Sequence, residues 1–154
     1  MPTPLEALGG TPNAHQPLPN MVTSGQPTHA HFDALSKAGV QVVLDIRDPM
    51  EPRPFDEPVL VRSLGMEYIN VPVNSATMTD ETLDRVLAVV RANQDRSMLF
   101  HCASGNRVGG ALIPHFMLDH GMSEEEAVQV AMRVGMRAAD LMEWGVGYAG
   151  SRGS

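Results

Sequence analysis

A single cysteine stands between an apolar run and a helical pattern. In the segment Leu99-Phe-His-Cys102-Ala-Ser-Gly105-Asn-Arg107-Val, residues typical of a buried strand precede Cys102, and residues typical of a helix follow it. Such a strand–loop–helix junction directs several backbone N–H groups, and the positive end of the helix dipole, at one point. The same N–H groups would stabilise a cysteine thiolate, the nucleophilic form of the residue. We therefore interpret the segment as an anion-binding loop that carries a nucleophile.

The residues after the cysteine suit the same chemistry. Gly105 lets the backbone turn without a Cβ in the way, and Arg107 carries a planar, permanently charged guanidinium that matches a tetrahedral oxyanion. A free cysteine is more often only a small buried hydrophobic residue, so the interpretation depends on the glycine and the arginine at these offsets. We expect Cys102 and Arg107 to be catalytic, and Arg107 to bind the anion together with the residues between them: Ala103, Ser104, Gly105 and Asn106.

Strands and helices are predicted to alternate around this loop. The clearest strand covers residues 40–46, because the sequence VQVVLDI is typical of a strand buried on both faces of a parallel sheet. Shorter strands are predicted within residues 21–27, at 68–71 and at 97–101, and helices after the capping residues Thr28, Thr79 and Ser123. This order predicts an α/β fold of three layers, with a mainly parallel central sheet and helices on both faces.

The length of 154 residues suits one compact domain. Five prolines fall within the first 20 residues, so we interpret residues 1–20 as an irregular, Pro-rich arm. Residues 21–148 then form a single catalytic domain, and residues 149–154 a tail. Inside the domain, acidic residues and prolines between Arg47 and Pro58 predict a surface loop without regular structure.

The composition excludes several classes of partner. The net charge is −7, so neither a basic nucleic-acid-binding surface nor a polybasic membrane-binding patch is expected. The sequence contains no apolar run of about 18 residues, the length that spans a bilayer. Since the chain has one cysteine, it cannot form an internal disulfide, and a reducing cytoplasm fits it best.

The motif from His101 to Arg107 resembles the signature of the cysteine phosphatase and rhodanese superfamilies. The chain is most similar to the phosphatase-like domain of bacterial beta-lactamase-hydrolase-like proteins, over about residues 21–145. That resemblance implies a cysteine-phosphatase-like fold and a cysteine-dependent enzyme that acts on a small anionic substrate without a cofactor. The segments that carry it, besides the cysteine loop, are Thr23-Ser-Gly-Gln-Pro27, Leu35-Ser-Lys-Ala-Gly39, Val42-Val-Leu-Asp-Ile-Arg47, Val71-Pro-Val73 and Gly121-Met-Ser-Glu-Glu-Glu-Ala127.

Within the two superfamilies, the loop spacing favours sulfur chemistry. Four residues separate Cys102 from Arg107, as in rhodanese-type sulfurtransferases, whereas tyrosine and dual-specificity phosphatases have five. A shorter loop encloses something nearer to a single sulfur atom than to a phosphoryl group. Val108 favours the same conclusion, because phosphatases usually carry a serine or threonine there, whose hydroxyl stabilises the departing thiolate.

The expected position of a general acid also argues against phosphatase chemistry. Cleavage of a phosphate ester by cysteine needs a proton donor for the leaving oxygen, normally an aspartate. The matching position after Val71-Pro-Val73 holds Asn74, which cannot donate a proton in that role. Asp80 is one substitute, although it is equally explained as an acid in the first turn of a helix. Glu81, Asp48 and Asp56 are the other acids considered.

We therefore expect a rhodanese-like sulfurtransferase. Cys102 would take sulfur from thiosulfate or a persulfide, hold it as a persulfide, and pass it to a thiol such as glutathione. Two alternatives stay open. One is a tyrosine- or dual-specificity-like phosphatase that cleaves a phosphate ester through a phosphocysteine. The other is a non-catalytic module in which Cys102 is oxidised or the loop only binds an anion.

Other polar residues receive supporting roles at most. His101 precedes the cysteine, and strand alternation directs it away from the sulfur, so we expect it to organise the loop through hydrogen bonds. Arg47 either faces the same pocket as Arg107 or pairs with acids of the neighbouring loop. No metal site is expected, because the spacings of His29 with His31 and of His115 with His120 do not suit metal ligands.

Overall fold

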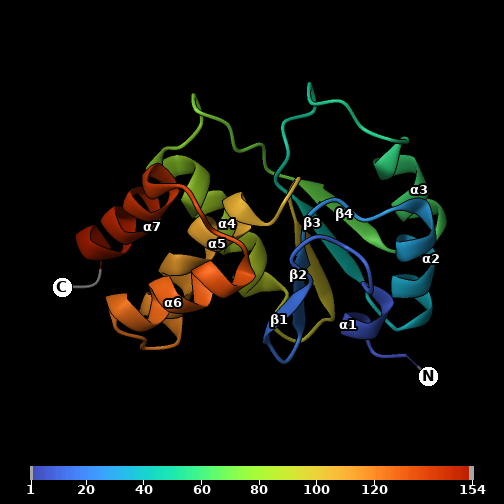
Figure 1. Cartoon of the computed structure of the whole chain (residues 1–154), viewed down its shortest axis with the longest axis horizontal. Helices are drawn as coiled ribbons and strands as arrows, with labels where there is room; N and C mark the ends of the chain where they lie inside the picture. The colour runs from blue at the N-terminus through green and yellow to red at the C-terminus, as the bar shows by residue number, and fades with distance from the viewer. Residues whose placement is uncertain (1, 153–154) are drawn as a thin grey trace.

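The most apolar strands lie side by side in the middle of a five-stranded sheet in the computed structural model, which describes residues 2–152 (Figure 1). β3 (Val42–Asp45) and β5 (Met98–His101) pair in parallel, and every residue of both is buried. β2 (Met21–Ser24) flanks β5 and β4 (Glu67–Asn70) flanks β3, again in parallel. β1 (His15–Leu18) adds an antiparallel edge, which gives the order β1-β2-β5-β3-β4.

Helices cover both faces of this sheet, as predicted (Figure 1). Because neighbouring strand residues point to opposite faces, Leu44 and Phe100 pack in one hydrophobic core, whereas Val43 and Leu99 pack in the other. The larger core includes residues of α4 (Asp80–Ala92), α5 (Asn106–Pro114), α6 (Glu124–Val134) and α7 (Ala139–Arg152). The smaller core includes residues of α1 (Pro4–Ala7), α2 (His29–Lys37) and α3 (Glu57–Ser63).

The predicted capping residues begin their helices. The side chains of Thr28, Thr79 and Ser123 each accept a hydrogen bond from the backbone N–H three residues later. α3 was not predicted, because it starts inside the proline-rich stretch. It is capped by Asp56, and Pro58 lies in its first turn. The backbone N–H groups of a first turn have no partner within the helix, so a proline, which has no N–H, costs no hydrogen bond there.

The two ends of the chain are more ordered than predicted. The expectation of an irregular arm over residues 1–20 is wrong for α1 and β1, and Leu8 is fully buried. Pro17 is tolerated because β1 is an edge strand. The tail expected at residues 149–154 is likewise helical as far as Arg152, the last residue of α7, and residues 153–154 lie outside the described part.

A proline widens the helix that follows the cysteine loop. Pro114 lies inside this helix, where it has no N–H to donate to the carbonyl of Gly110. The next residues, His115–Asp119, form a π-helix (η1) with hydrogen bonds between residues five apart. None of the helices in residues 2–152 is both long and apolar enough to cross a membrane.

Candidate active site

The cysteine loop has the predicted strand–loop–helix form. Cys102 follows the last residue of β5 and is fully buried. Gly105 precedes α5 with φ +97°, and its N–H donates to Cys102 Sγ at 3.1 Å. A side chain at Gly105 would be strained at this φ and would bring a Cβ within 2.8 Å of the Val134 carbonyl. The glycine therefore allows an N–H group to face the sulfur.

The segment after β2 packs directly on this loop. The N–H of Cys102 donates to the carbonyl of Ser24 at 3.3 Å, and the N–H of Gln26 donates to the carbonyl of Ala103 at 3.0 Å. A Cβ at Gly25 would lie 2.6 Å from that same Ala103 oxygen, so only glycine permits the approach. The Thr23–Pro27 segment, singled out by the family resemblance, thus holds the backbone of the cysteine loop.

Two of the loop residues make contacts with distant segments of the chain. The carbonyl of Ser104 accepts a hydrogen bond from Asn13 Nδ2 at 2.7 Å, so the N-terminal segment reaches the loop. Asn106 Oδ1 accepts the N–H groups of Arg137 and Ala138, at 2.6 and 3.2 Å. The Asn106 side chain therefore fixes the connection between α6 and α7.

Arg107 is held in a fixed orientation by Glu51. Nη1 and Nη2 of Arg107 donate to the two carboxylate oxygens of Glu51, at 2.6 and 2.9 Å, and Nη1 also donates to the carbonyl of Val73 at 3.1 Å. Of the five N–H bonds of a guanidinium, these use three. No hydrogen bond within residues 2–152 uses Nε–H or the second Nη2–H. These two lie on one edge of the guanidinium and can hold two oxygens of an anion.

The charged hydrogen bonds of Glu51 keep it ionised. The hydrogen bond from Arg107 lowers the pKa of Glu51 to about 2, with further help from the backbone of Asp48 and the charge of Arg47, against the opposing effect of burial. Arg47 contacts Glu51 Oε1 through Nε at 3.4 Å and donates through Nη1 to Gln26 Oε1 at 2.6 Å. Arg47 thus pairs with an acid of the neighbouring loop, and through Glu51 it is connected to Arg107.

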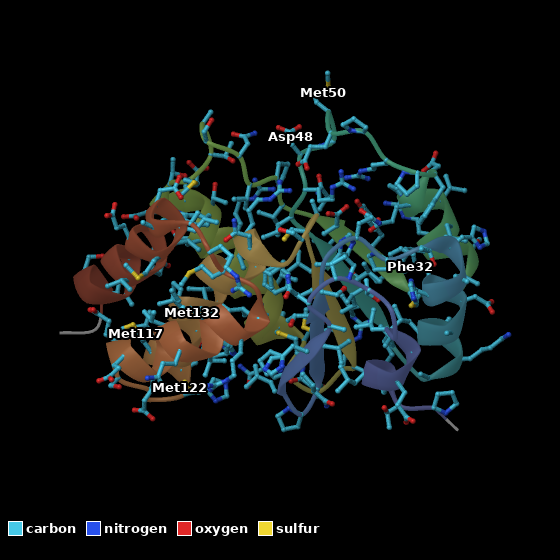
Figure 2. All side chains as sticks on the ribbon, viewed as in Figure 1. Phe32, Asp48, Met50, Met117, Met122 and Met132 are labelled. Atoms are coloured by element: carbon cyan, nitrogen blue, oxygen red, sulfur yellow. The ribbon has the colours of Figure 1, made fainter. Side chains whose placement is uncertain are left out.

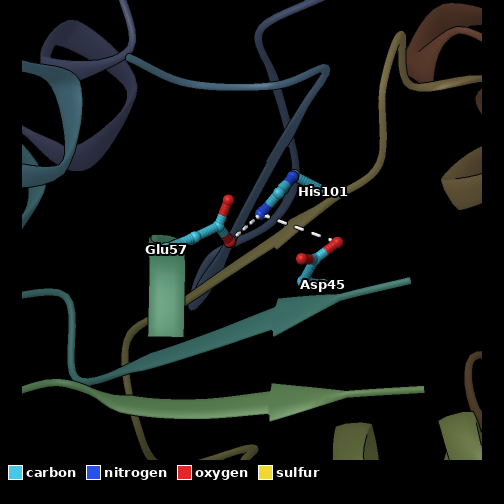
Figure 3. Close-up of side chains that lie close together, drawn as sticks. All are labelled: Asp45, Glu57 and His101. Carbon is cyan, nitrogen blue, oxygen red and sulfur yellow. Dashed lines mark hydrogen bonds and ion pairs between the residues drawn. The ribbon is translucent and has the colours of Figure 1, made fainter. Parts of the chain in front are cut away.

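The buried ring of His101 contacts the backbone of the cysteine loop, as the prediction of a hydrogen-bonding role required. It is fully buried, with Nδ1 3.1 Å from the carbonyl of Cys102 and Nε2 2.6 Å from Glu57 Oε2 (Figure 3). Both partners are acceptors, so both ring nitrogens carry hydrogen and the ring is an imidazolium. Burial alone would lower the pKa of His101, but the charge and hydrogen bond of Glu57 outweigh it and raise the pKa. The same pairing lowers the pKa of Glu57 in spite of its burial.

The three residues drawn in Figure 3 could be mistaken for a metal site. Candidate ligand atoms of Asp45, Glu57 and His101 lie within 4.8 Å of one another. However, Arg53 Nη2 lies 3.0 Å from Asp45 Oδ2, and the Tyr68 hydroxyl donates to the same oxygen at 2.6 Å. Because His101 and Arg53 already supply positive charge beside the two carboxylates, this cluster fits a buried ion-pair network better than a cation site.

The buried pair makes a prediction about stability and pH. The pKa of His101 is raised in the folded chain, whereas an unfolded histidine titrates near about 6.5. Above that pH the unfolded chain loses the proton first, so the free energy of unfolding should fall as pH rises toward the folded pKa. Denaturant unfolding of the wild type from pH 6 to pH 9 measures this. Glu57→Gln should make the free energy of unfolding less dependent on pH. An equal slope of this free energy against pH in both proteins would contradict the prediction.

Gln26 connects the two ends of the cysteine loop. Its Nε2 donates to Glu57 Oε1 at 2.8 Å, and its Oε1 accepts from Arg47. One side of this connection reaches the backbone of the nucleophile and the other reaches the guanidinium. The roles of Gln26 and Glu57 were not predicted from the sequence, because both residues come from segments distant from the cysteine loop. The complete series of contacts is Cys102, His101, Glu57, Gln26, Arg47, Glu51 and Arg107.

Asp48, and not Asp80, is connected to Arg107 through Glu51. Asn74 Nδ2 donates to Asp48 Oδ2 at 2.5 Å, and the N–H of Asp48 donates to Glu51, the partner of Arg107. Figure 2 shows Asp48 on the loop after β3, beyond the end of the sheet where the cysteine loop begins. Asp80 contacts Arg152 of α7 at 3.5 Å instead, at the start of α4. The structure therefore connects Asn74 and Asp48, but not Asp80, to Glu51, the partner of Arg107.

Comparisons with known proteins bear on the family and the fold of the chain. A model of the family described as DSP-PTPase phosphatase fused to NAD+ kinase matches residues 13–143. No curated protein matches the chain significantly. A presumed phosphatase (DUF442) from Shewanella putrefaciens CN-32 has a similar structure, with a TM-score of 0.83 and 21% identity over 96% of this chain and 97% of that one.

Two further solved structures share the fold. TpbA of P. aeruginosa aligns with a TM-score of 0.70 and 19% identity, over 92% of this chain and 84% of that one. The catalytic domain of the PP-IP phosphatase SIW14 from S. cerevisiae aligns with a TM-score of 0.75 and 16% identity, over 88% and 85% of the two chains. At these identities the likeness establishes a cysteine-phosphatase-like fold.

Proposed function

Because the chain belongs to the family of DSP-PTPase phosphatases fused to NAD+ kinase, we propose that it hydrolyses phosphate monoesters through a phosphocysteine on Cys102. The observation that carries the proposal is the free edge of Arg107, whose orientation Glu51 fixes beside the cysteine loop. The expected sulfurtransferase activity, with thiosulfate, persulfide and glutathione as partners, has no support from the family or the fold. The phosphatase alternative fits both better.

In the proposed reaction, each step is carried out by a different group of the chain. The Cys102 thiolate attacks phosphorus while Gly105 N–H faces the sulfur, and Arg107 Nε–H and the free Nη2–H hold two phosphoryl oxygens. The bond from phosphorus to the ester oxygen breaks, and that oxygen takes a proton from Asp48, the proposed general acid. Water then attacks the phosphocysteine and returns a proton to Asp48. Inorganic phosphate leaves, and the thiolate is restored.

The substrate class is a phosphate monoester, and the relatives indicate how varied its alcohol can be. TpbA has been solved with phosphotyrosine, and SIW14 is described as a PP-IP phosphatase. For this chain we infer only the phosphoryl group, which the cysteine loop and Arg107 would bind. The closer resemblance to the beta-lactamase-hydrolase-like proteins and the cytoplasmic location stay predictions.

A side-by-side assay tests the proposal. The wild type is given para-nitrophenyl phosphate in one reaction, and thiosulfate with glutathione in another. We expect phosphate release in the first and, after rapid acid quench, a phosphoryl group on Cys102 by mass spectrometry. An added sulfur atom on Cys102 without phosphate release would establish the sulfurtransferase instead. A chain that is inactive in both assays would favour the non-catalytic alternative.

Gln26 provides a prediction about positioning. Gln26→Met keeps the length of the side chain but removes its hydrogen bonds to Glu57 and Arg47. Because small misplacements of catalytic groups are costly, we expect kcat to fall by about 10- to 100-fold. Gln16→Met, an exposed control in β1, should leave kcat unchanged. A lower thermal unfolding midpoint with an unchanged kcat would show that Gln26 serves stability alone.

A further inference from the structure

Two histidines meet at the far end of the helix that begins at the cysteine loop. In an α-helix, residues five apart point in different directions, but Pro114 turns the next segment into the π-helix η1. This wider turn brings His115 and His120 to the same side, with their Nε2 atoms 3.1 Å apart. The two rings are therefore in contact, although the same spacing in an α-helix would separate them.

A carboxylate fixes the orientation of the first ring. Asp119 Oδ2 lies 2.7 Å from His115 Nδ1, and Arg91 holds both oxygens of Asp119 at 2.8 and 3.0 Å. The Arg91 guanidinium donates to both oxygens of Asp119, so Asp119 is an ionised acceptor. His115 Nδ1 therefore carries the hydrogen. With the hydrogen on Nδ1, the neutral ring carries its lone pair on Nε2.

This arrangement matches that of a metal-binding histidine. A histidine that binds a metal through one ring nitrogen commonly donates its other ring N–H to a carboxylate. His115 donates to Asp119 in this way. Two imidazole nitrogens that bind one ion at about 2.0–2.1 Å, with angles between about 90° and 110°, lie about 2.9–3.4 Å apart. The observed Nε2 separation falls in this range, and the two rings are inclined at 83°. An ion could replace the hydrogen between His115 and His120 with little movement.

The surroundings leave room for further ligands. Both histidines line a pocket of about 210 Å³. Asn20, which lines it too, gives both amide hydrogens to the carbonyls of Asn93 and Arg96, at 3.1 Å each. Its side-chain oxygen has no hydrogen-bond partner within residues 2–152. An oxygen donor and space for water therefore adjoin the two nitrogens. The other lining residues are Leu18, Pro19, Met21, Val90 and Gln94.

We propose that His115 and His120 bind a divalent transition-metal ion of the kind that imidazole favours, with Zn²⁺ as the probe. Asp119 orients the first ligand, and water or Asn20 completes the coordination. The site lies after α5, whereas the cysteine loop lies before it, so the proposal does not depend on the phosphatase activity. Without metal, His120 Nε2–H donates to His115 Nε2.

Calorimetric titration with Zn²⁺ tests the site. The full chain carries Cys102→Ser in every sample, so that no thiol contributes to binding. We expect one Zn²⁺ per chain, a loss of affinity of at least about 10-fold in His120→Ala, and a loss of about 10- to 100-fold in Asp119→Asn. His120 is exposed, so its replacement should not disturb folding. His29→Ala, another exposed histidine, is the matched control and should bind as the parent does.

The result that would overturn the proposal is equally direct. If the parent does not bind Zn²⁺, or binds it as tightly after His120→Ala, the two histidines form only a hydrogen-bonded pair. Nitrogen chemical shifts of the His115 ring provide a second measurement. Its Nε2 signal should move on addition of Zn²⁺ while Nδ1 stays protonated. Unchanged ring signals in the presence of saturating Zn²⁺ would contradict the site even if metal binds elsewhere.

Discussion

Replacing Cys102 with serine should reduce phosphate-monoester hydrolysis by about 10⁴-fold or more, and should leave the binding of inorganic phosphate almost unchanged. A serine hydroxyl is of similar size but is not ionised near neutral pH, so it cannot attack phosphorus as the thiolate does. The groups proposed to hold the phosphoryl oxygens stay in place, because Arg107 is oriented by Glu51 and Val73 and not by the sulfur. Loss of turnover and retention of binding are thus separable.

Initial rates with para-nitrophenyl phosphate and calorimetric titration with inorganic phosphate measure the two quantities. Met50→Ala is a suitable control, since Met50 is 90% exposed on the loop after β3 and should change neither (Figure 2). A Cys102→Ser protein that keeps substantial turnover would exclude the phosphocysteine mechanism. One that loses phosphate binding altogether would show that the sulfur itself holds the site together.

The fold was predictable where local sequence decides the structure. The strand predicted at residues 40–46, observed as β3 (Val42–Asp45), is recognisable because it is buried on both faces. Thr28, Thr79 and Ser123 mark the starts of their helices because their side chains cap them. The short elements α1 and α3 were not predicted. They have few residues and little periodicity of their own, and burial against the rest of the chain stabilises them, as the fully buried Leu8 shows.

The site was predictable only in part, for a similar reason. Cys102, Arg107 and His101 lie in one continuous segment whose form follows from local pattern. Glu51, Gln26 and Glu57 reach the same site from positions 45 to 76 residues before Cys102, and the two glutamates lie among prolines. A proline-rich loop carries no periodicity from which the direction of a side chain can be inferred. Only the folded chain shows that its acids hold the arginine.

The loop spacing illustrates the same limit. Counting four residues between the cysteine and Arg107 indicates the size of the loop but not the direction of the guanidinium. In the structure that direction depends on Glu51 and the Val73 carbonyl, which leave one edge of Arg107 free. The spacing therefore does not decide between a sulfur and a phosphoryl group. The presence of Asn74 where an aspartate was expected is similarly inconclusive. Its side-chain amide binds Asp48, an acid from another loop.

Asp48→Asn should slow hydrolysis to an extent that depends on the leaving group. Asn74 Nδ2 binds one oxygen of Asp48, and the N–H of Met50 donates to the other, so the carboxyl is fixed beside the partner of Arg107. General acid catalysis is typically worth about 10²- to 10⁴-fold. We expect a loss of that size in kcat for phenyl phosphate, whose phenolate needs a proton. The loss should be much smaller for para-nitrophenyl phosphate, whose leaving group is a stable anion.

The comparison of the two substrates separates an acid from a residue that only supports the loop. Damage to the position of Arg107 or Cys102 would slow both substrates equally, because both need the same phosphoryl contacts. Loss of a proton donor slows only the ester with the more basic leaving oxygen. Asp80→Asn is the matched control, since Asp80 pairs with Arg152 away from the loop. If Asp80→Asn showed the leaving-group dependence and Asp48→Asn did not, the acid would have to reach the site by a movement of α4.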